Sequence, residues 1–390
     1  MPSPQPVLLS SGYAQDFSSY LLPNRKGNLT VRRGQRLTVA CPGSSFRILS
    51  GSRDHVAADC VGDTVFSVDS VDYTLNGLVC SSAATPSARY TGASCGYRGL
   101  FAVVEVGFYA GAEFHRLYDV CFSNESSSTA YAHHTIPADW IGAQKNVSLS
   151  DVAWTDGSFF GFDVETAYAK QDETIGKLLN VSVEQLFAEG RLERGALAPA
   201  ADFMLESQQV ATFFGVNSAP RWTQLDGGDW GTLEQVLRKS LRRLEVYTGT
   251  AGQLALRNSA GVPTAVYLAT SKGRKKLPVP KYFWKIVYEP QSKLCAAFVT
   301  VNDPTAKLED LAERYSLCTD ICDGINWLPW EKGNQTGGLS FCCEYEEFKR
   351  VVPGVPELDV SGHRESSSSD VAPVLWLTAS LLAAVALTGA

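Results

Sequence analysis

Ten cysteines, spread from Cys41 to Cys343, set the first limit on how this 390-residue chain folds. Their number is even, and they do not form the repeated C-x-x-C spacing of a zinc ribbon. Cys318 and Cys322, followed later by adjacent cysteines at 342 and 343, come nearest to it. Adjacent cysteines make poor tetrahedral ligands, however, and no histidine is close in sequence. We therefore expect structural disulfides formed in an oxidising compartment, although their pairing does not follow from the sequence.

Glycosylation sequons indicate the same compartment. Five Asn-x-Ser/Thr triplets are present, and glycans are added to them only in the secretory pathway. Residues 1–15 nevertheless lack a basic segment and an apolar run of signal-peptide length, so we expect the leader to be missing or the start to be misassigned. The five expected glycosylation sites are Asn28, Asn124, Asn146, Asn180 and Asn334.

The overall composition is that of a folded globular protein. Hydrophobic residues make up 45% of the chain and charged residues 19%, and 390 residues suffice for one large or two medium domains. The net charge of -7 argues against a generic nucleic-acid coat protein, which would be basic. It leaves open a local basic groove.

Residues 1–135 read as a β-rich module. Short β-type runs at Leu37–Ala40, Thr64–Val68 and Phe101–Phe108 alternate with Gly, Ser and Asn. Five cysteines fall in this region, so we expect a small module braced by disulfides. Its only candidates for chemistry are three histidines that we interpret as structural or surface residues, namely His115, His133 and His134.

Residues 136–358 mix helices with strands, and their irregular order predicts an α+β domain. The segment Glu165–Phe187 is partly helical in character, and Thr232–Leu244 has apolar residues at helical spacing without Gly or Pro. Strands are expected at Thr264–Leu268, Phe283–Tyr288 and Ala296–Val301, the last two as an antiparallel hairpin.

The end of the chain predicts a membrane attachment. After a polar, Ser-rich linker at 359–370, residues 371–390 form an uncharged apolar run just long enough to cross a bilayer. No basic residues follow it, and small residues at Ser366–Ser369 or at Ser361 offer cleavage sites for a glycolipid anchor. We expect a glycosylphosphatidylinositol signal, with a plain membrane helix as the alternative.

An ordered set of charged and polar residues lies between Glu193 and Arg238. It begins Glu-Arg-Gly-Ala at Glu193 and continues with Leu-Asp-Gly-Gly-Asp-Trp from Leu225. This order resembles the DNA/RNA non-specific endonuclease family, whose ββα-metal site opens with Asp-Arg-Gly-His. In that comparison Glu193 stands in place of Asp, and Ala196 stands in place of His.

The resemblance extends over nearly all of 136–358. It implies a ββα-metal nuclease domain with an antiparallel sheet and helices, preceded by the β-rich module. Segments that look like secreted animal members of the family are Val246–Gly252, Val279–Lys285, Cys343–Phe348 and, before the domain, Ala130–Thr135.

The resemblance also implies roles for individual residues. Arg194 matches an arginine that neutralises phosphate charge, and Asp226 falls where the family has its metal-binding Asn. A carboxylate remains a hard oxygen ligand suited to Mg²⁺, so we expect metal binding to survive. Glu234 and Arg238 match the helix Glu and Arg; four residues apart, they project from one helix face and can pair. Asn217 matches a supporting asparagine.

Ala196 is the departure with the largest chemical consequence. Phosphodiester hydrolysis needs a base to activate water, and a methyl group cannot accept a proton. General-base catalysis contributes roughly 10²–10⁴-fold, or about 3–5 kcal/mol of barrier. Glu193 displaces a charge by one methylene, which is a milder change. Rescue by His133 or His134 has no support in the sequence beyond their presence.

Two basic clusters follow the motif. Lys239, Arg242 and Arg243 are expected on the same helix as Arg238, where they would bind nucleic acid. The second cluster lies in a Gly-containing loop, and we favour its interpretation as solvated surface charge; it comprises Lys272, Arg274, Lys275 and Lys276.

These observations predict an extracellular, membrane-anchored member of the family that has lost most of its hydrolytic activity. It would still bind DNA or RNA without sequence preference, with Mg²⁺ and no organic cofactor. Two alternatives stay open, namely a residual or rescued endonuclease and an adhesion or receptor scaffold. A basic groove facing the site would favour the first two hypotheses over the scaffold.

Overall fold

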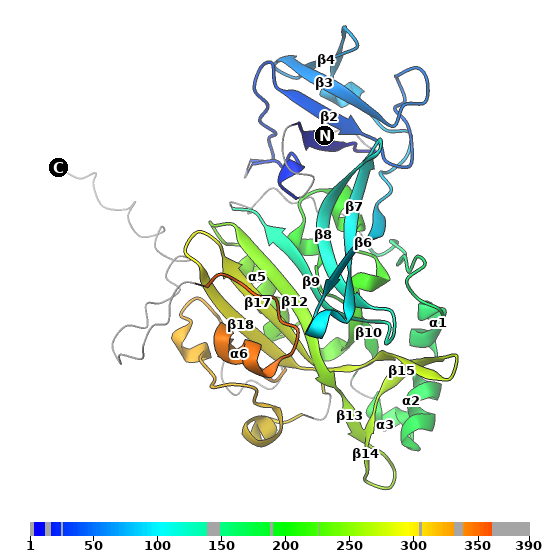
Figure 1. The fold of residues 1–390 in the computed structure, drawn as a ribbon, viewed down its shortest axis with the longest axis vertical. Helices are drawn as coiled ribbons and strands as arrows, with labels where there is room; N and C mark the ends of the chain where they lie inside the picture. Colours follow the sequence, from blue (N-terminus) through cyan, green and yellow to red (C-terminus); the bar gives the residue numbers. More distant parts are fainter. Residues whose placement is uncertain are drawn as a thin grey trace, which may run out of the picture.

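The computed structural model describes residues 4–11, 17–24, 26–138, 149–187, 190–225, 227–303, 306–330 and 338–360. They form an α+β fold of antiparallel sheets with short helices, as the sequence predicts (Figure 1). In these ranges no helix has the length and apolar character needed to cross a membrane. Several predicted features lie outside them: Asn146, Asp226, Asn334, the cleavage sites at Ser361 and Ser366–Ser369, and the apolar segment 371–390.

A small antiparallel sheet comes first in the chain and lies at the top of Figure 1. Its five strands pair in sequence order and pack their own apolar cluster, which includes the Cys41–Cys80 disulfide. The strands are β1 (Val7–Ser10), β2 (Arg36–Ala40), β3 (His55–Gly62), β4 (Val65–Val68) and β5 (Val71–Thr74).

An eight-stranded antiparallel sheet forms the centre of the molecule. Its order is β19-β18-β17-β12-β9-β8-β7-β6, so four strands come from before residue 137 and four from after it. The boundary expected at residue 135 thus falls inside β9 and cuts through this sheet. The strands are β6 (Ser87–Cys95), β7 (Phe101–Ala110), β8 (Glu113–Ser123), β9 (Ser128–Ile136), β12 (Leu244–Gln253), β17 (Pro280–Glu289), β18 (Leu294–Val301) and β19 (Ser340–Glu344).

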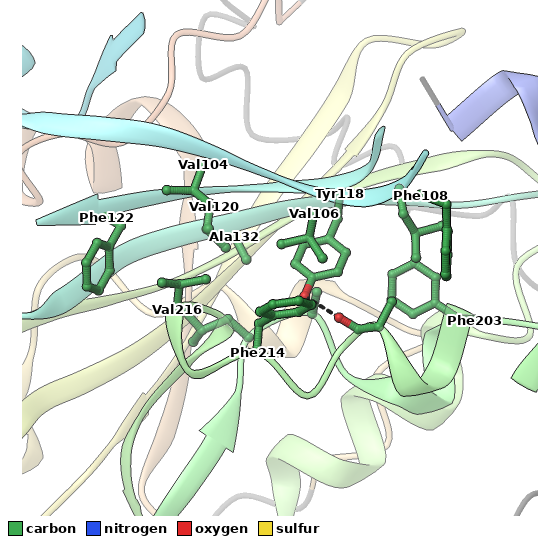
Figure 2. Packing of buried hydrophobic residues seen from close by; sticks show 14 of the residues in the cluster. Val104, Val106, Phe108, Tyr118, Val120, Phe122, Ala132, Phe203, Phe214 and Val216 are labelled. Atoms are coloured by element: carbon green, nitrogen blue, oxygen red, sulfur yellow. Dashed lines mark hydrogen bonds between the residues drawn. The ribbon is translucent and has the colours of Figure 1, made fainter. Parts of the chain in front are cut away.

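The main core lies between β7–β9 and the irregular segment around residues 197–219. Valines and aromatic residues of the sheet, among them Val106 and Tyr118, pack against Phe203 and Phe214 (Figure 2). The Tyr118 hydroxyl donates a 2.8 Å hydrogen bond to the Ala211 carbonyl, which satisfies a buried polar group. This core holds the candidate site segment against the sheet.

The small sheet shares this core with the large one. Tyr20 packs edge-on against Phe108 with ring centroids 6.4 Å apart, and its hydroxyl donates to the His115 carbonyl at 2.7 Å. Val7 and Leu9 of β1 belong to the same buried cluster as Phe108. The two sheets therefore support one another across an apolar contact.

Short helices and two-stranded ribbons surround the large sheet. The helices are α1 (Val164–Ala169), α2 (Gln171–Leu179), α3 (Val183–Leu186), α4 (Glu206–Val210), α5 (Asp229–Leu237) and α6 (Tyr345–Val351). The ribbons pair β10 (Leu192–Ala196) with β11 (Ser218–Trp222), β13 (Ala255–Arg257) with β14 (Pro263–Ala265), and β15 (Tyr267–Ser271) with β16 (Arg274–Pro278).

One predicted helix and one predicted strand differ clearly from the observed elements. The helix expected over Thr232–Leu244 ends at Leu237, because the Ser240 hydroxyl accepts from the Arg242 amide and donates to its carbonyl, which turns the chain. Leu244 then begins a central strand, where burial in the sheet outweighs helix propensity. The expected strand Thr264–Leu268 divides between β14 and β15. The hairpin of β17 and β18 is confirmed.

Eight cysteines form disulfides, as expected, and two are thiols. Besides Cys41–Cys80, one bridge joins Cys95 to Cys121, and two more brace the C-terminal region. Those two pair Cys318 with Cys343 and Cys322 with Cys342, which excludes thiolate zinc ligands there. The thiols are Cys60 and Cys295.

Three of the expected glycosylation sites lie in the described ranges, and all are exposed. Asn28 lies in the small sheet's connecting loop, Asn124 in the turn between β8 and β9, and Asn180 directly after α2. The Asn180 amide donates to the Ser259 hydroxyl at 2.9 Å, and the Asn124 amide oxygen accepts from Tyr90. Glycosylation at these positions stays a prediction.

Candidate active site

The Glu-Arg-Gly-Ala segment forms β10, paired in antiparallel register with β11. Glu193 lies opposite Arg221, and Ala196 lies opposite Ser218. Asn217 lies directly before β11 and is fully buried; its side chain accepts from the Ala198 amide and donates to the Ala198 carbonyl, both at 2.9 Å. Asn217 thus fixes the backbone that follows Ala196.

Gly195 lets the Arg221 side chain cross β10. A Cβ atom at position 195 would lie 2.8 Å from the Arg221 Cβ and 3.0 Å from its Nε. Burial lowers the pKa of the Arg221 guanidinium, while the charges of Glu234 and Glu193 oppose this shift. A third cation therefore belongs to this site, on the strand that pairs with the motif.

Arg194 is held by carboxylates. Its guanidinium makes two hydrogen bonds to Asp156, the Nη2–Oδ2 distance being 3.2 Å, and lies 3.4 Å from Glu165 Oε2. Trp154 and Tyr168 rings flank it, and only 6% of the side chain is exposed. A phosphate would have to compete with Asp156 for this arginine.

Glu234 pairs with a buried lysine of the central sheet. Helix α5 packs Trp230 and Leu233 into the core, which directs Glu234 towards β17. The Lys285 Nζ lies 3.5 Å from Glu234 Oε1, donates to the Thr248 hydroxyl at 2.6 Å, and sits 5.0 Å from the Trp230 ring centroid. Lys285 is completely buried, so this pair is shielded from solvent.

Arg238, the C-terminal cap of α5, pairs with Asp202 and not with Glu234. Its Nη1 donates to Asp202 Oδ1 at 2.9 Å, and the other carboxylate oxygen lies 2.8 Å from His134 Nε2. Burial lowers the pKa of His134, so its neutral imidazole donates its Nε2 hydrogen to the Asp202 carboxylate. The predicted pairing of Glu234 with Arg238 is thus replaced by two buried partners from other elements.

Both histidines of β9 are held by carboxylates. The His134 side chain is 0% exposed, so bulk water does not reach it. His133 directly precedes His134 in β9, so its side chain points to the opposite face of the sheet. There it lies between Asp119 and Glu245. Burial opposes protonation of His133, but hydrogen bonds to these carboxylates outweigh it and raise its pKa to about 9. A protonated imidazole is not a base.

The three basic residues expected on the helix lie after it, in the turn from α5 to β12. All are exposed, but two have carboxylate partners. Arg242 Nη1 lies 3.6 Å from Glu289 Oε2, and Arg243 Nη2 lies 2.7 Å from Glu245 Oε1. The remaining member of the set is Lys239.

The described residues do not assemble a magnesium site around Ala196. Glu234 is engaged by Lys285, and Asp226, the expected ligand, lies outside the described ranges. Within these ranges one group of three potential ligands is found, Asp320 with Cys322 and Cys342, and its two cysteines form a disulfide.

Four residues of this site were not predicted: Asp156, Asp202, Arg221 and Lys285. A signal was present for two of them, since Asp202 and Lys285 are single charges in otherwise apolar runs. Such a charge is stable in a core only with a partner. Nothing in the local sequence around Asp156 or Arg221 indicated a partner.

Comparison with known proteins gives consistent results. A sequence model of the DNA/RNA non-specific endonuclease family matches residues 101–348. A salivary endonuclease of Lutzomyia longipalpis is 26% identical over 355 residues, covering 84% of this chain and 78% of that protein. The salivary protein Tsal2A of Glossina morsitans morsitans is 25% identical over 337 residues, covering 84% and 83%.

The chain is also similar to solved structures. A chain in the crystal structure of the EndoG/EndoGI complex has a TM-score of 0.36 and 17% identity, covering 51% of this chain and 75% of that one.

Proposed function

Because the chain belongs to the DNA/RNA non-specific endonuclease family, we propose that it is an extracellular nucleic-acid-binding protein whose hydrolytic activity is lost or much reduced. The observation that carries the proposal is the methyl side chain of Ala196 at the end of β10, where the family pattern has histidine. The neighbouring His134 is sealed from solvent, and His133 is protonated at neutral pH. No imidazole among these is available to activate water.

Binding is expected to outlast hydrolysis because the two need different groups. Phosphate contacts need cations, and Arg194, Arg221 and Arg238 remain around β10 and α5. Asp226 supplies a carboxylate for Mg²⁺ in this proposal. Titration calorimetry with MgCl₂ tests that role, since Asp226→Ala should abolish a binding isotherm that the native chain shows.

A degradation and binding assay on the purified protein tests the proposal. Plasmid DNA and RNA are incubated with Mg²⁺, with EDTA as the control, while fluorescence anisotropy measures binding of labelled oligonucleotides. We expect binding at low salt with cleavage near background. Cleavage at the rate of ordinary nucleases would overturn the proposal.

Two other functions each have one observation in their favour. The name of the Lutzomyia longipalpis relative favours a residual or rescued endonuclease. Arg194 and Arg238 form ion pairs with Asp156 and Asp202, so they are less available to phosphate, which favours an adhesion or receptor scaffold. Cleavage that EDTA abolishes would support the first, and absence of any nucleic-acid binding would support the second.

The extracellular location rests on the four disulfides, which persist in oxidising compartments. We further propose that the five sequons are glycosylated. We also propose that the segment 371–390 attaches the protein to the extracellular face of the plasma membrane, by a glycolipid in preference to a membrane helix. Treatment with peptide N-glycosidase followed by mass spectrometry would identify which asparagines carry glycans.

A further inference from the structure

One part of this acidic chain contains no acidic residue. Between Glu245 and Glu289 the sequence has seven Lys or Arg and no Asp or Glu, although the net charge of the whole chain is -7. This stretch forms β12, the two hairpins β13–β14 and β15–β16, and β17. Four of the seven cations cluster in the β15–β16 hairpin, which we call the basic hairpin: Lys272, Arg274, Lys275 and Lys276.

The geometry of the basic hairpin exposes its charges. Ser271 pairs with Arg274, so Lys272 and Gly273 form a two-residue turn, and both have positive φ, 50° and 72°. This is the turn whose twist matches that of the flanking strands. Lys272, Arg274 and Lys275 are exposed, and the ammonium of Lys275 lies 5.1 Å from the Tyr267 ring centroid.

The hairpin is anchored at its base. Lys276 Nζ donates to the Asn124 carbonyl at 2.9 Å and also to the Glu125 carbonyl, and the Leu277 amide donates to the Ser126 carbonyl. On the other strand, the Ser271 hydroxyl donates to the Gly161 carbonyl at 3.3 Å. These bonds limit the ordering entropy that a ligand would have to overcome.

The charges of the hairpin tip are not compensated. Among the described residues, no carboxylate lies within ion-pair distance of Lys272, Arg274 or Lys275. Helices α1 and α2 pack against β15, but their acidic residues have other partners. Glu165 of α1 lies near Arg194, and in α2 Asp172 pairs with Arg191 and Glu173 with Lys177. By contrast, the arginines of the motif and of the α5–β12 turn are paired with Asp or Glu.

We propose that the basic hairpin binds the phosphodiester backbone of nucleic acid and that it, not the arginines around Ala196, supplies most of the electrostatic affinity. This inference rests on the proposed function. A two-stranded ribbon of this size fits a nucleic-acid groove, and its base contacts β11, the strand that pairs with β10. A bound strand is therefore held beside the motif without using the Arg194–Asp156 pair.

Three variants, each removing three positive charges, test the inference. The hairpin variant is Lys272→Ala, Arg274→Ala and Lys275→Ala. The turn variant is Lys239→Ala, Arg242→Ala and Arg243→Ala. The control variant removes three exposed cations of the small sheet's loop, with Lys26→Ala, Arg32→Ala and Arg33→Ala. Equal loss of charge separates a local contact from the effect of net charge.

Binding of a labelled duplex is measured by anisotropy over a range of salt concentrations, with circular dichroism to confirm folding. The hairpin variant should lose about tenfold or more in affinity at low salt, and its log–log salt slope should fall by about 2 to 3, at roughly 0.9 per phosphate contact. The control variant should keep the native slope. If the hairpin variant misfolds, Lys272→Glu at the exposed turn should lower affinity and slope in the same direction.

The outcomes separate this inference from the proposed function. If the native protein binds but the hairpin variant binds equally well, or all three variants lose affinity equally, the hairpin inference is overturned and the proposed function stands. If the turn variant loses more than the hairpin variant, the site lies on the turn instead. Tighter binding of a heparin oligosaccharide than of a duplex of equal charge would overturn the inference in favour of a sulfated polysaccharide. If the native protein binds no nucleic acid at low salt, the proposed function fails with it.

Discussion

At the scale of single residues, Ala196 removes a catalytic group, whereas its neighbours preserve the local backbone structure. The methyl group removes a proton acceptor, but the backbone around it is still fixed by Asn217, and Gly195 still admits Arg221. The geometry of the strand pair is therefore preserved where the chemistry is not. This separation makes restoration of activity by one substitution a reasonable expectation.

We predict that Ala196→His raises Mg²⁺-dependent cleavage of plasmid DNA and RNA by roughly 10²–10⁴-fold, the usual contribution of a general base. Initial rates for the native protein and the variant, each with and without EDTA, measure the effect. Ala196→Gln, which adds a polar side chain without a base, is the matched control and should stay inactive. An inert but folded and metal-bound His variant would move the defect to Asp226 or Glu193.

We predict that Lys285 matters more for stability than any exposed cation. Lys285→Met keeps most of the side-chain volume but leaves the Glu234 carboxylate without its buried partner, which should lower the free energy of unfolding by about 3–5 kcal/mol. Adding Glu234→Gln should recover part of this loss, because the uncompensated charge is removed. Urea unfolding of the two single variants and the double variant measures the coupling; simple additivity would contradict the pairing.

At the scale of elements, a charged triad joins three adjacent strands of the large sheet. His133 of β9 lies between Asp119 of β8 and Glu245 of β12, and stacks on Tyr247 with ring centroids 4.2 Å apart. Arg116 and Arg243 pair with the outer sides of the two carboxylates. This network crosses the join between the two halves of the sequence.

The triad predicts a pH dependence of stability. Burial alone would lower the pKa of His133, but Asp119 and Glu245 raise it to about 9 from the unfolded value near 6.5. Protonated His133 therefore stabilises the fold fully below about pH 6.5. This contribution, about 3 kcal/mol of unfolding free energy, is lost as the pH rises through about 9. Unfolding free energies between pH 6.5 and 9.5 should therefore fall more steeply for the native protein than for His133→Gln. Equal slopes would show that the triad does not titrate in this way.

At the scale of the whole molecule, the large sheet defines which parts of the chain can fold together. Four of its strands come from residues 87–136, so the nuclease-like half lacks a complete sheet without them. The small sheet adds Tyr20 and Val7 to the shared core, but β12, β17 and their neighbours do not pair with it.

We predict that a chain of residues 82–360 folds, whereas residues 136–360 do not. The longer piece keeps every strand of the large sheet and three disulfides, and it should unfold cooperatively at a lower temperature than the intact protein because Phe108 becomes exposed. The shorter piece leaves β12 without β9 and should show no cooperative transition. Calorimetry of both pieces distinguishes this from two independent modules divided at residue 135.

The proposed anchor is also a property of the whole molecule. If the segment 371–390 is exchanged for a glycolipid, phosphatidylinositol-specific phospholipase C should release the protein from cells. Retention after this treatment, with the C-terminal peptide still detected by mass spectrometry, would indicate a membrane helix.

The sequence by itself determined the features that depend on local pattern and on matched motifs. Short runs rich in β-branched and aromatic residues predicted β17 and β18, and the motif from Glu193 indicated the family. The absence of histidine at position 196 is visible in the sequence alone. Disulfides in place of zinc followed from cysteine spacing. These properties depend on residue identity and on spacing along the chain, so the sequence alone is enough to predict them.

Only the tertiary structure decided which charges are paired and which are free. Arg194 and Asp156 are far apart in sequence, as are Lys285 and Glu234, and their contacts follow from the packing of strands and α5. Strand packing also joined β9 to β12 across the expected boundary. Pairing energies depend on burial and on distances between remote segments, so the motif arginines and the basic hairpin could be told apart only in the folded protein.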